Sequence, residues 1–132
     1  MTRAVLADTG PLYAASDEAD EHHQRALLQL EALARDRREV LIPYPILLEA
    51  YSLLLFKLGR NTASGWLTDV ANASFVNPTP EDYARGFTMV RALADQSITL
   101  VDATIAALAS RLKLEVWTYD HHFDMMRIPV WR

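Results

Sequence analysis

The sequence predicts an α/β fold in which helices cover both faces of a central parallel sheet. Two short apolar runs, at 4–7 and 40–42, have the composition of strands that are buried on both faces. Longer segments with apolar residues at helical spacing, such as 46–57, separate the apolar runs along the chain. Strands that alternate with helices form a parallel sheet, because each helix returns the chain across one face of the sheet.

The individual elements follow from apolar spacing, helix caps and breakers. The expected strands are 3–7, 40–42, 74–76, 115–118 and 128–130. The expected helices are 11–16, 20–36, 46–57, 62–71, 80–94 and 99–112. Asn61 or Thr62 is the expected cap of the fourth helix, and Thr79 is the expected cap of the fifth. Pro129 cannot donate a ladder hydrogen bond, which places the last strand at an edge of the sheet.

Composition predicts one globular domain that spans residues 1–132. Hydrophobic residues make up 51% of the chain, which excludes a disordered protein. The absence of cysteine excludes disulfides, thiolate zinc sites and cysteine nucleophiles. No apolar stretch reaches the roughly 20 residues of a membrane span, and Asp8 interrupts the first apolar run too early for a signal peptide. These features are compatible with a reducing compartment, and the expected location is the cytoplasm.

Two acids come shortly after expected strands. Asp8 follows the run 4–7 and precedes Gly10, while Asp120 follows the strand expected at 115–118. Ligands of open α/β sheets bind at the carboxyl ends of the strands, so both carboxylates are candidates for a binding site. Each also has an ordinary structural alternative, because aspartate often caps the helix or turn that follows it.

Two further acids lie on expected helices without a cation nearby. Neither Glu49 nor Asp102 has a lysine or arginine three or four residues away on its helix. Burial of an unpaired carboxylate costs free energy, so Glu49 is hard to explain by folding alone. The alternatives are that Glu49 faces solvent and that Asp102 forms a variant of the capping box with Thr99.

Together these four acids predict a divalent-metal site. A parallel sheet brings such positions to one edge, where four carboxylates would repel one another unless a cation neutralised them. A ligand set made only of oxygen favours magnesium or manganese over zinc. The pairs His22-His23 and His121-His122 lack the spacing of metal-binding helix pairs, and we expect them to be surface or packing residues. Asp124 is expected to lie too far along the chain to join the site.

With these residues identified, the chain resembles a PIN domain of the VapC toxin type. The resemblance covers about residues 4–129 and depends on the order and spacing of several segments. These segments are LADTGPL (6–12), DEHHQRA (20–26), PILLE (45–49), DQSITLVDA (95–103) and TYDHHF (118–123). One departure is Tyr119, where family members often carry a small or polar residue, and this affects access of the substrate.

The resemblance implies both a topology and a function. It implies a sheet of order 3-2-1-4-5 and a magnesium- or manganese-dependent endoribonuclease, with Asp8, Glu49, Asp102 and Asp120 as the metal-binding and catalytic acids. Thr9 and Thr118 match polar residues that line that site. It also implies a VapB-type antitoxin as partner and a homodimer, which agrees with the crowding of apolar residues in the segment 44–58.

Charge is consistent with a nuclease that depends on its metal. A net charge of −4 argues against coating of nucleic acid by bulk electrostatics but not against an enzyme that reaches phosphates through a cation. We expect cleavage of single-stranded segments of structured RNA, because splayed strands expose the phosphate that is cut. Arg85, Arg91, Arg111 and Lys57 are candidates for contacts to the RNA backbone, and the sequence does not choose among them.

Other functions fit the residues less well or stay open. A receiver domain of two-component signalling also binds magnesium, but it requires adjacent acids after its first strand and a lysine after its last. A haloacid-dehalogenase-type phosphatase requires a second aspartate at position 10, which is Gly10. An inactive PIN scaffold would lack one of the four acids. A PIN-domain RNA-processing nuclease that is not a toxin remains open.

Overall fold

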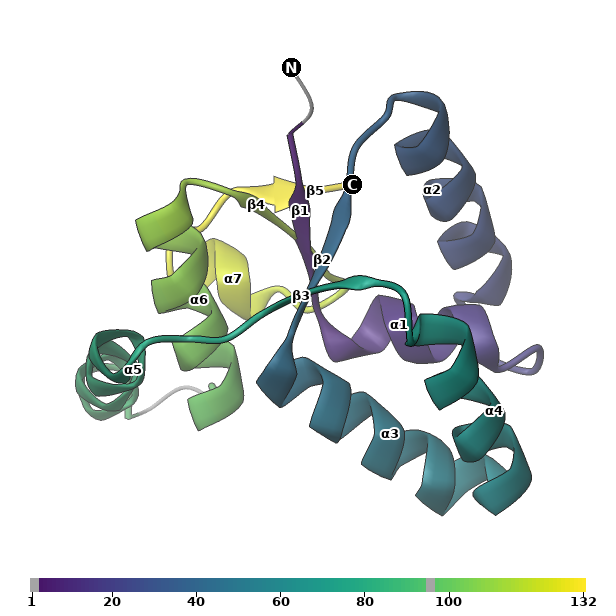
Figure 1. Ribbon diagram of the computed structural model, residues 1–132. Coiled ribbons are helices and arrows are strands. Elements are labelled where there is room, and N and C mark those ends of the chain that lie inside the picture. The colour runs from purple at the N-terminus through teal and green to yellow at the C-terminus, as the bar shows by residue number, and fades with distance from the viewer. Residues whose placement is uncertain (1–2, 95–96) are drawn as a thin grey trace.

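The chain forms a five-stranded, entirely parallel sheet with β1 at its centre. The computed structural model describes residues 3–94 and 97–132. The strands are β1 (Val5–Ala7), β2 (Val40–Pro43), β3 (Ser74–Val76), β4 (Glu115–Trp117) and β5 (Val130–Trp131). Their order is β3-β2-β1-β4-β5, as Figure 1 shows, and every neighbouring pair is parallel. This confirms the predicted fold class and the order 3-2-1-4-5.

Helices cover both faces of the sheet. They are α1 (Thr9–Ser16), α2 (His23–Arg35), α3 (Tyr44–Leu58), α4 (Arg60–Val70), α5 (Pro80–Ala92), α6 (Leu100–Leu112) and α7 (His122–Met125). Figure 1 shows α1, α2 and α4 on one side of the sheet and α5, α6 and α7 on the other. From β1 the chain proceeds outward to β2 and β3, and it then crosses to the other side of β1, where β4 and β5 lie. Because crossovers between parallel strands are right-handed, helices on the two halves of this path pack on opposite faces of the sheet. Among the described helices, none combines the length and apolar character needed to cross a membrane.

The core lies on both sides of β1. Val5, Leu6 and Ala7 are fully buried, as the continuous apolar run predicts for a central parallel strand. Residues 103–109 of α6 are buried as well, because small alanine side chains let this helix approach the sheet closely. Trp117 on β4 and Phe123 on α7 are the two largest fully buried side chains among the described residues.

Helix α5 packs on α6 through one glycine and one ion pair. A Cβ atom placed on Gly86 would lie 2.8 Å from Thr104 Oγ1 and 3.2 Å from the Thr104 backbone nitrogen. Thr79 caps α5 in a reciprocal capping box with Asp82, which confirms the predicted cap. The carboxylate of Asp82 also accepts hydrogen bonds from Nε and Nη2 of Arg111 on α6, at 3.0 and 2.9 Å, and this arginine lowers the pKa of Asp82.

Most elements begin and end within three residues of their predicted bounds, and two predictions near helix starts are wrong. Helix α3 begins at Tyr44, two residues early, because Pro45 is tolerated in a first helical turn. Helix α4 begins directly after Gly59, so the predicted cap at Asn61 or Thr62 is wrong; both residues lie inside the helix. Helix α7 is not among the predicted helices. The segment 95–103 begins with two residues that lie outside the described part of the chain.

Candidate active site

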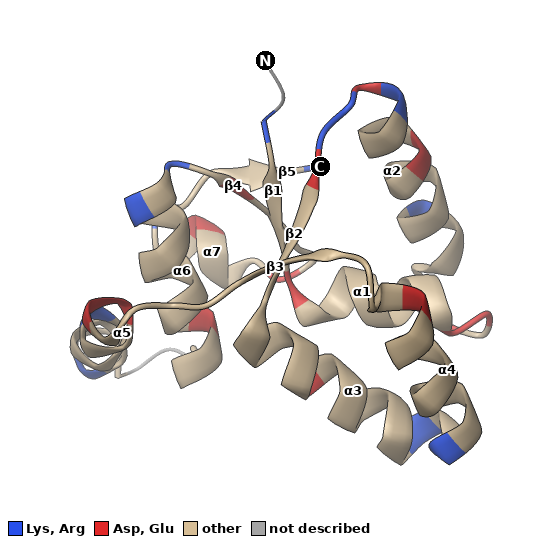
Figure 2. Ribbon diagram, in the orientation of Figure 1, with Lys and Arg blue, Asp and Glu red and all other residues tan. Residues whose placement is uncertain are grey.

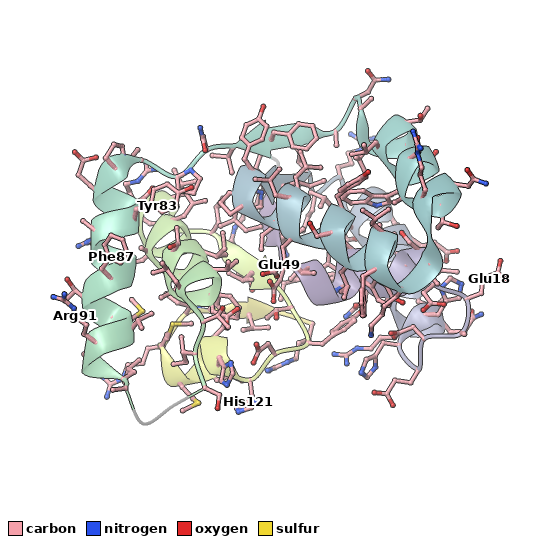
Figure 3. All side chains as sticks on the ribbon, turned by 90° about the horizontal axis from the view of Figure 1, so that it is seen from below. Glu18, Glu49, Tyr83, Phe87, Arg91 and His121 are labelled. Carbon is pink, nitrogen blue, oxygen red and sulfur yellow. The ribbon has the colours of Figure 1, made fainter. Side chains whose placement is uncertain are left out.

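All four predicted acids line one open cavity at the carboxyl edge of the sheet. This cavity has a volume of about 370 Å³ and is lined by Asp8, Thr9, Gly10, Glu49, Thr99, Asp102, Tyr119 and Asp120. The acids come from different elements: Asp8 follows β1, Glu49 lies on α3, Asp102 begins α6 and Asp120 follows β4. Figure 3 shows Glu49 near the middle of the molecule, where α3 faces the opposite half. The parallel sheet thus gathers residues that are distant in sequence, as predicted.

Asp8 is the buried centre of this cavity. Its side chain is 6% exposed, and its two oxygens accept hydrogen bonds from the Thr9 backbone nitrogen at 2.8 Å and the Thr118 hydroxyl at 2.7 Å. The pKa of Asp8 is raised to about 6, mainly by burial; the hydrogen bonds from Thr118 and Thr9 oppose this rise, and the charges of Asp102 and Glu49 add to it. Asp8 also caps α1, so its structural role and its place in the site coexist.

Glu49 is exposed, which was one of the alternatives left open by the sequence, and it lines the cavity as well. Its exposure follows from its position, because α3 turns this face toward the open cavity. Its carboxylate is nevertheless held in place, since the Thr9 hydroxyl donates to Oε1 at 2.5 Å. Thr9 and Thr118, the two polar residues implied by the resemblance, therefore each fix one acid.

Asp102 both takes part in the capping box of α6 and lines the cavity. It forms a capping box with Thr99, in which the Asp102 backbone nitrogen donates to the Thr99 hydroxyl at 3.1 Å. The reciprocal bond, from the Thr99 nitrogen to Asp102 Oδ2, is longer at 3.3 Å. Asp102 is 8% exposed, so it is a second acid of the site that the fold removes largely from water.

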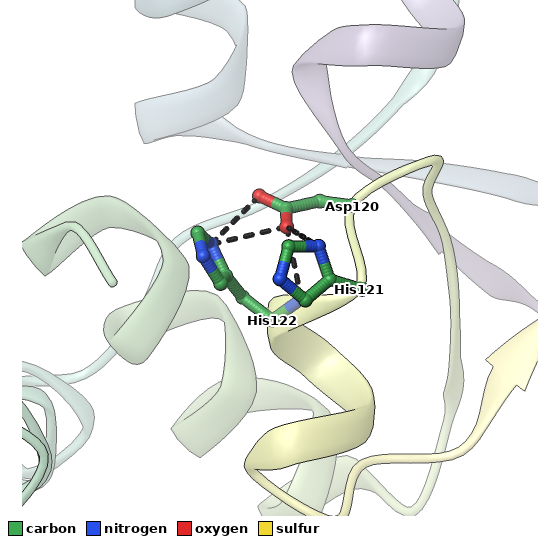
Figure 4. Close-up of side chains that lie close together, drawn as sticks. All are labelled: Asp120, His121 and His122. Carbon is green, nitrogen blue, oxygen red and sulfur yellow. Dashed lines mark hydrogen bonds and ion pairs between the residues drawn. The ribbon is translucent and has the colours of Figure 1, made fainter. Parts of the chain in front are cut away.

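In the second histidine pair, His122 is a packing residue, and the side chains that it packs against are two acids of the cavity. Its Nδ1 lies 3.0 Å from an oxygen of Asp120 and 3.5 Å from one of Asp102, so this imidazole links two of the acids. Figure 4 shows the group formed by Asp120, His121 and His122. Asp120 accepts a hydrogen bond from the His122 backbone nitrogen at 2.9 Å, which forms an Asx-type turn. The spacing of Asp120 and His122 could therefore have predicted this contact, whereas the spacing between the two histidines does not.

Asp124 lies outside the site, as expected. It is exposed and accepts a hydrogen bond from Arg132 at 2.9 Å instead of lining the cavity. Asp124 lies on α7, the short helix that also carries His122, so a substitution of Asp124 is a suitable control for substitutions of the cavity acids.

The donor set of the cavity fits a divalent cation. Four carboxylates converge in one cavity, and the pKa of the most buried one is raised. Hard cations prefer such oxygen ligands. The imidazole of His122 contacts Asp102 and Asp120, so it supports the acids from their side. Figure 2 shows that lysine and arginine gather elsewhere, between α2 and β2, where α3 meets α4, and at the end of α6.

Solved structures with the same fold extend over nearly the whole chain. VapC20 of Mycobacterium tuberculosis, described as a sarcin–ricin loop cleaving toxin, superimposes with a TM-score of 0.83 and 17% identity over 97% of this chain and 98% of that one. VapBC2 of Rickettsia felis, bound to a promoter DNA fragment, gives 0.73 and 14% over 98% and 97%. FitAcB of Neisseria gonorrhoeae gives 0.70 and 17% over 97% and 96%.

The sequence itself also matches a family model. No curated protein matches the chain. The model of the PIN domain, in contrast, matches residues 5–128, a range that contains β1 to β4 and the four acids of the cavity. On this match, and with the parallel sheet of order 3-2-1-4-5, the chain belongs to the PIN-domain family.

Proposed function

We propose that this chain is a single PIN domain, residues 1–132, that acts as a metal-dependent endoribonuclease. The observation that carries the proposal is the meeting of Asp8, Glu49, Asp102 and Asp120 in one cavity of a PIN fold. Four carboxylates in one cavity are suited to bind Mg²⁺ or Mn²⁺. The raised pKa of Asp8, the most buried of them, is hard to explain if the acids serve only to stabilise the fold.

The four acids are the proposed metal ligands, and the threonines are their supports. When bound, the cation would activate a water molecule and stabilise the charge that develops on the phosphate. Thr118 orients Asp8 and Thr9 orients Glu49, so neither carboxylate has to be ordered when the ligand arrives. His122 holds Asp120 beside Asp102.

RNA is the proposed substrate, cut within single-stranded segments of a folded molecule. VapC20, which shares the fold, is described as cleaving the sarcin–ricin loop. An open cavity on the surface suits a splayed strand better than a rigid duplex, because the reacting phosphate has to approach recessed acids.

The proposed biological role is that of the toxin in a toxin–antitoxin pair, acting in the cytoplasm on cellular RNA. The structural neighbours include VapC20, described as a toxin, and VapBC2. The cavity would also attract an arginine from a VapB-type antitoxin, which would pair with the carboxylates and block access of the metal.

Incubation with a panel of RNA hairpins and manganese tests this proposal. We expect cuts in the loops of at least one hairpin, with its stem and a duplex DNA of the same sequence left intact. The products are mapped by sequencing their ends, and Asp102→Asn, which replaces a ligand by an amide of similar size, serves as the inactive control. Intact loops together with cut duplex DNA would contradict the ribonuclease proposal.

We also propose that the chain is a homodimer that buries exposed apolar residues of α3. Phe56 is 86% exposed, Leu48 is 67% exposed and Leu55 is 41% exposed, whereas Leu54 on the opposite face is fully buried. Such a patch is typical of a self-complementary two-fold contact.

Analytical ultracentrifugation at tens of micromolar tests the dimer. We expect a mass of twice 14.9 kDa for the unmodified chain and a monomer for Phe56→Glu, because a buried charge in an apolar contact is unfavourable. Leu28→Glu is the matched control, since Leu28 is 64% exposed on α2. A monomeric unmodified chain would contradict this proposal.

A further inference from the structure

One arginine lies against the aromatic wall of the acidic cavity. The guanidinium carbon of Arg25 is 4.3 Å from the centre of the Tyr119 ring, and Tyr119 lines the cavity together with the four acids. We propose that Arg25 binds an RNA phosphate next to the one that is cut, and that Tyr119 and Gln29 position it. This inference rests on the proposed nuclease function and assigns a substrate-positioning role to residues outside the set of acids.

The side chain of Tyr119 is held in place by hydrogen bonds that connect it to the core of the protein. The Tyr119 hydroxyl donates to Gln29 Oε1 at 2.6 Å, and the same oxygen accepts from Nε1 of Trp117 at 2.8 Å. Trp117 belongs to β4 and is fully buried, so it anchors Gln29 rigidly. The guanidinium of Arg25 therefore lies on a ring whose position is set by the sheet.

Arg25 is also available for an anion. Among residues 3–94 and 97–132, no carboxylate forms a salt bridge with it, and its guanidinium donates no side-chain hydrogen bond. A guanidinium that rests on an aromatic ring keeps its N–H groups, and these suit the bidentate binding of phosphate. The positive charge of Arg25, which rests on the ring of a residue that lines the acidic cavity, is therefore not neutralised by an ion pair within the described part of the protein.

Helix stability does not explain an arginine at this position. Arg25 is the third residue of α2, and the first turn of this helix contains no acid. A cation near a helix N-terminus opposes the helix dipole, whereas Arg35 in the last turn is placed favourably. The helix dipole therefore does not favour an arginine here, and the favourable contact of this side chain is the one with the Tyr119 ring beside the cavity.

The other candidate cations are either paired with a carboxylate or lie away from the acidic cavity. Arg111 is bound by the buried Asp82, and Arg85 lines a separate cavity between α5 and α6. Figure 3 shows Arg91 on the outer side of α5, well away from Glu49. Lys57 lies 5.2 Å from the Tyr13 ring, about two turns along α3 from Glu49. Of these five cations, Arg25 is the one in direct contact with a residue of the cavity.

Steady-state cleavage of a hairpin RNA with manganese tests the inference. We expect Arg25→Ala to raise KM about tenfold while kcat changes less than about twofold, and to lower the salt dependence of kcat/KM by about one charge, because one phosphate contact is lost. Arg35→Ala, on the same helix, is expected to match the unmodified protein. Arg25→Lys should give an intermediate KM, since lysine keeps the charge but not the planar group.

A substitution of Tyr119 distinguishes a role in positioning Arg25 from a general loss of stability. Tyr119→Leu is expected to raise KM as Arg25→Ala does, and the double variant should be no worse than either single one, because both changes remove the same contact. An unmodified protein that cuts RNA while Arg25→Ala retains its KM and salt dependence would overturn this inference alone. An unmodified protein that cuts no RNA would overturn the proposed function and this inference with it.

Discussion

Asp8→Asn is expected to remove nuclease activity while it stabilises the metal-free protein. An amide is a poorer metal ligand than a carboxylate, so we expect kcat/KM to fall by at least about 100-fold. Asparagine still accepts the hydrogen bond that caps α1, and it is similar in size to aspartate. The variant therefore keeps its fold and loses the negative charge at the centre of the cavity, together with the acceptor for the Thr118 hydroxyl, because the amide nitrogen cannot accept a hydrogen bond.

The gain in stability follows from the pKa of Asp8. Burial raises this pKa from 3.8 to about 6, so the folded protein binds the proton more tightly than the unfolded chain does. The free energy of unfolding of the metal-free protein accordingly falls as pH rises from about 4 to 6, and the loss of about 3 kcal/mol persists at pH 7. Because asparagine carries no charge, Asp8→Asn avoids this loss.

Thermal unfolding in EDTA at pH 5 and pH 7.5 measures this effect. We expect the melting temperature of Asp8→Asn to exceed that of the unmodified protein by several degrees at pH 7.5, and by less at pH 5. Asp124→Asn removes an exposed acid that lies outside the cavity and should change neither activity nor this pH dependence. Full cleavage by Asp8→Asn would contradict the assigned role of this carboxylate.

Gly86→Ala is expected to lower the free energy of unfolding by about 1–3 kcal/mol, although alanine favours helices. The added Cβ would lie 2.8 Å from Thr104 Oγ1 and 3.2 Å from the Thr104 backbone nitrogen, so α5 has to move away from α6. Thr104 cannot turn aside freely, because its hydroxyl donates to the Leu100 carbonyl at 2.8 Å.

Gly65→Ala is the matched control for this substitution. Gly65 also lies inside a helix, but a Cβ there would meet no described atom within 4 Å. We expect this variant to be stabilised by about 0.5–1 kcal/mol, because alanine loses less backbone entropy on folding. Urea unfolding of both variants gives the comparison, and equal effects would contradict the tight packing of α5 on α6.

The sheet and much of the site could be predicted because their signals are local. An uninterrupted apolar run identifies β1, and Asp8 follows directly from its place after that strand. The Thr79 and Thr99 capping boxes each depend on residues three positions apart. Since parallel strands end at a common edge, local strand assignments were enough to predict that the acids meet.

The remaining features depend on contacts between distant residues. Gln29 and Trp117 are 88 positions apart, so no local pattern connects α2 to the wall of the cavity. His122 joins the site because Asp102 approaches it from another helix, and Glu49 is exposed because α3 borders an open cavity. Such contacts arise from tertiary packing, which propensity and spacing do not specify.

The dependence of RNA cleavage on a divalent cation tests the central claim most directly. A hairpin RNA that the unmodified protein cuts in manganese is incubated with the same protein in excess EDTA and again after manganese is restored in excess over the chelator. The four-acid site predicts no cleavage in EDTA and full recovery when manganese returns, with no recovery for Asp8→Asn. Undiminished cleavage in excess EDTA would contradict the account.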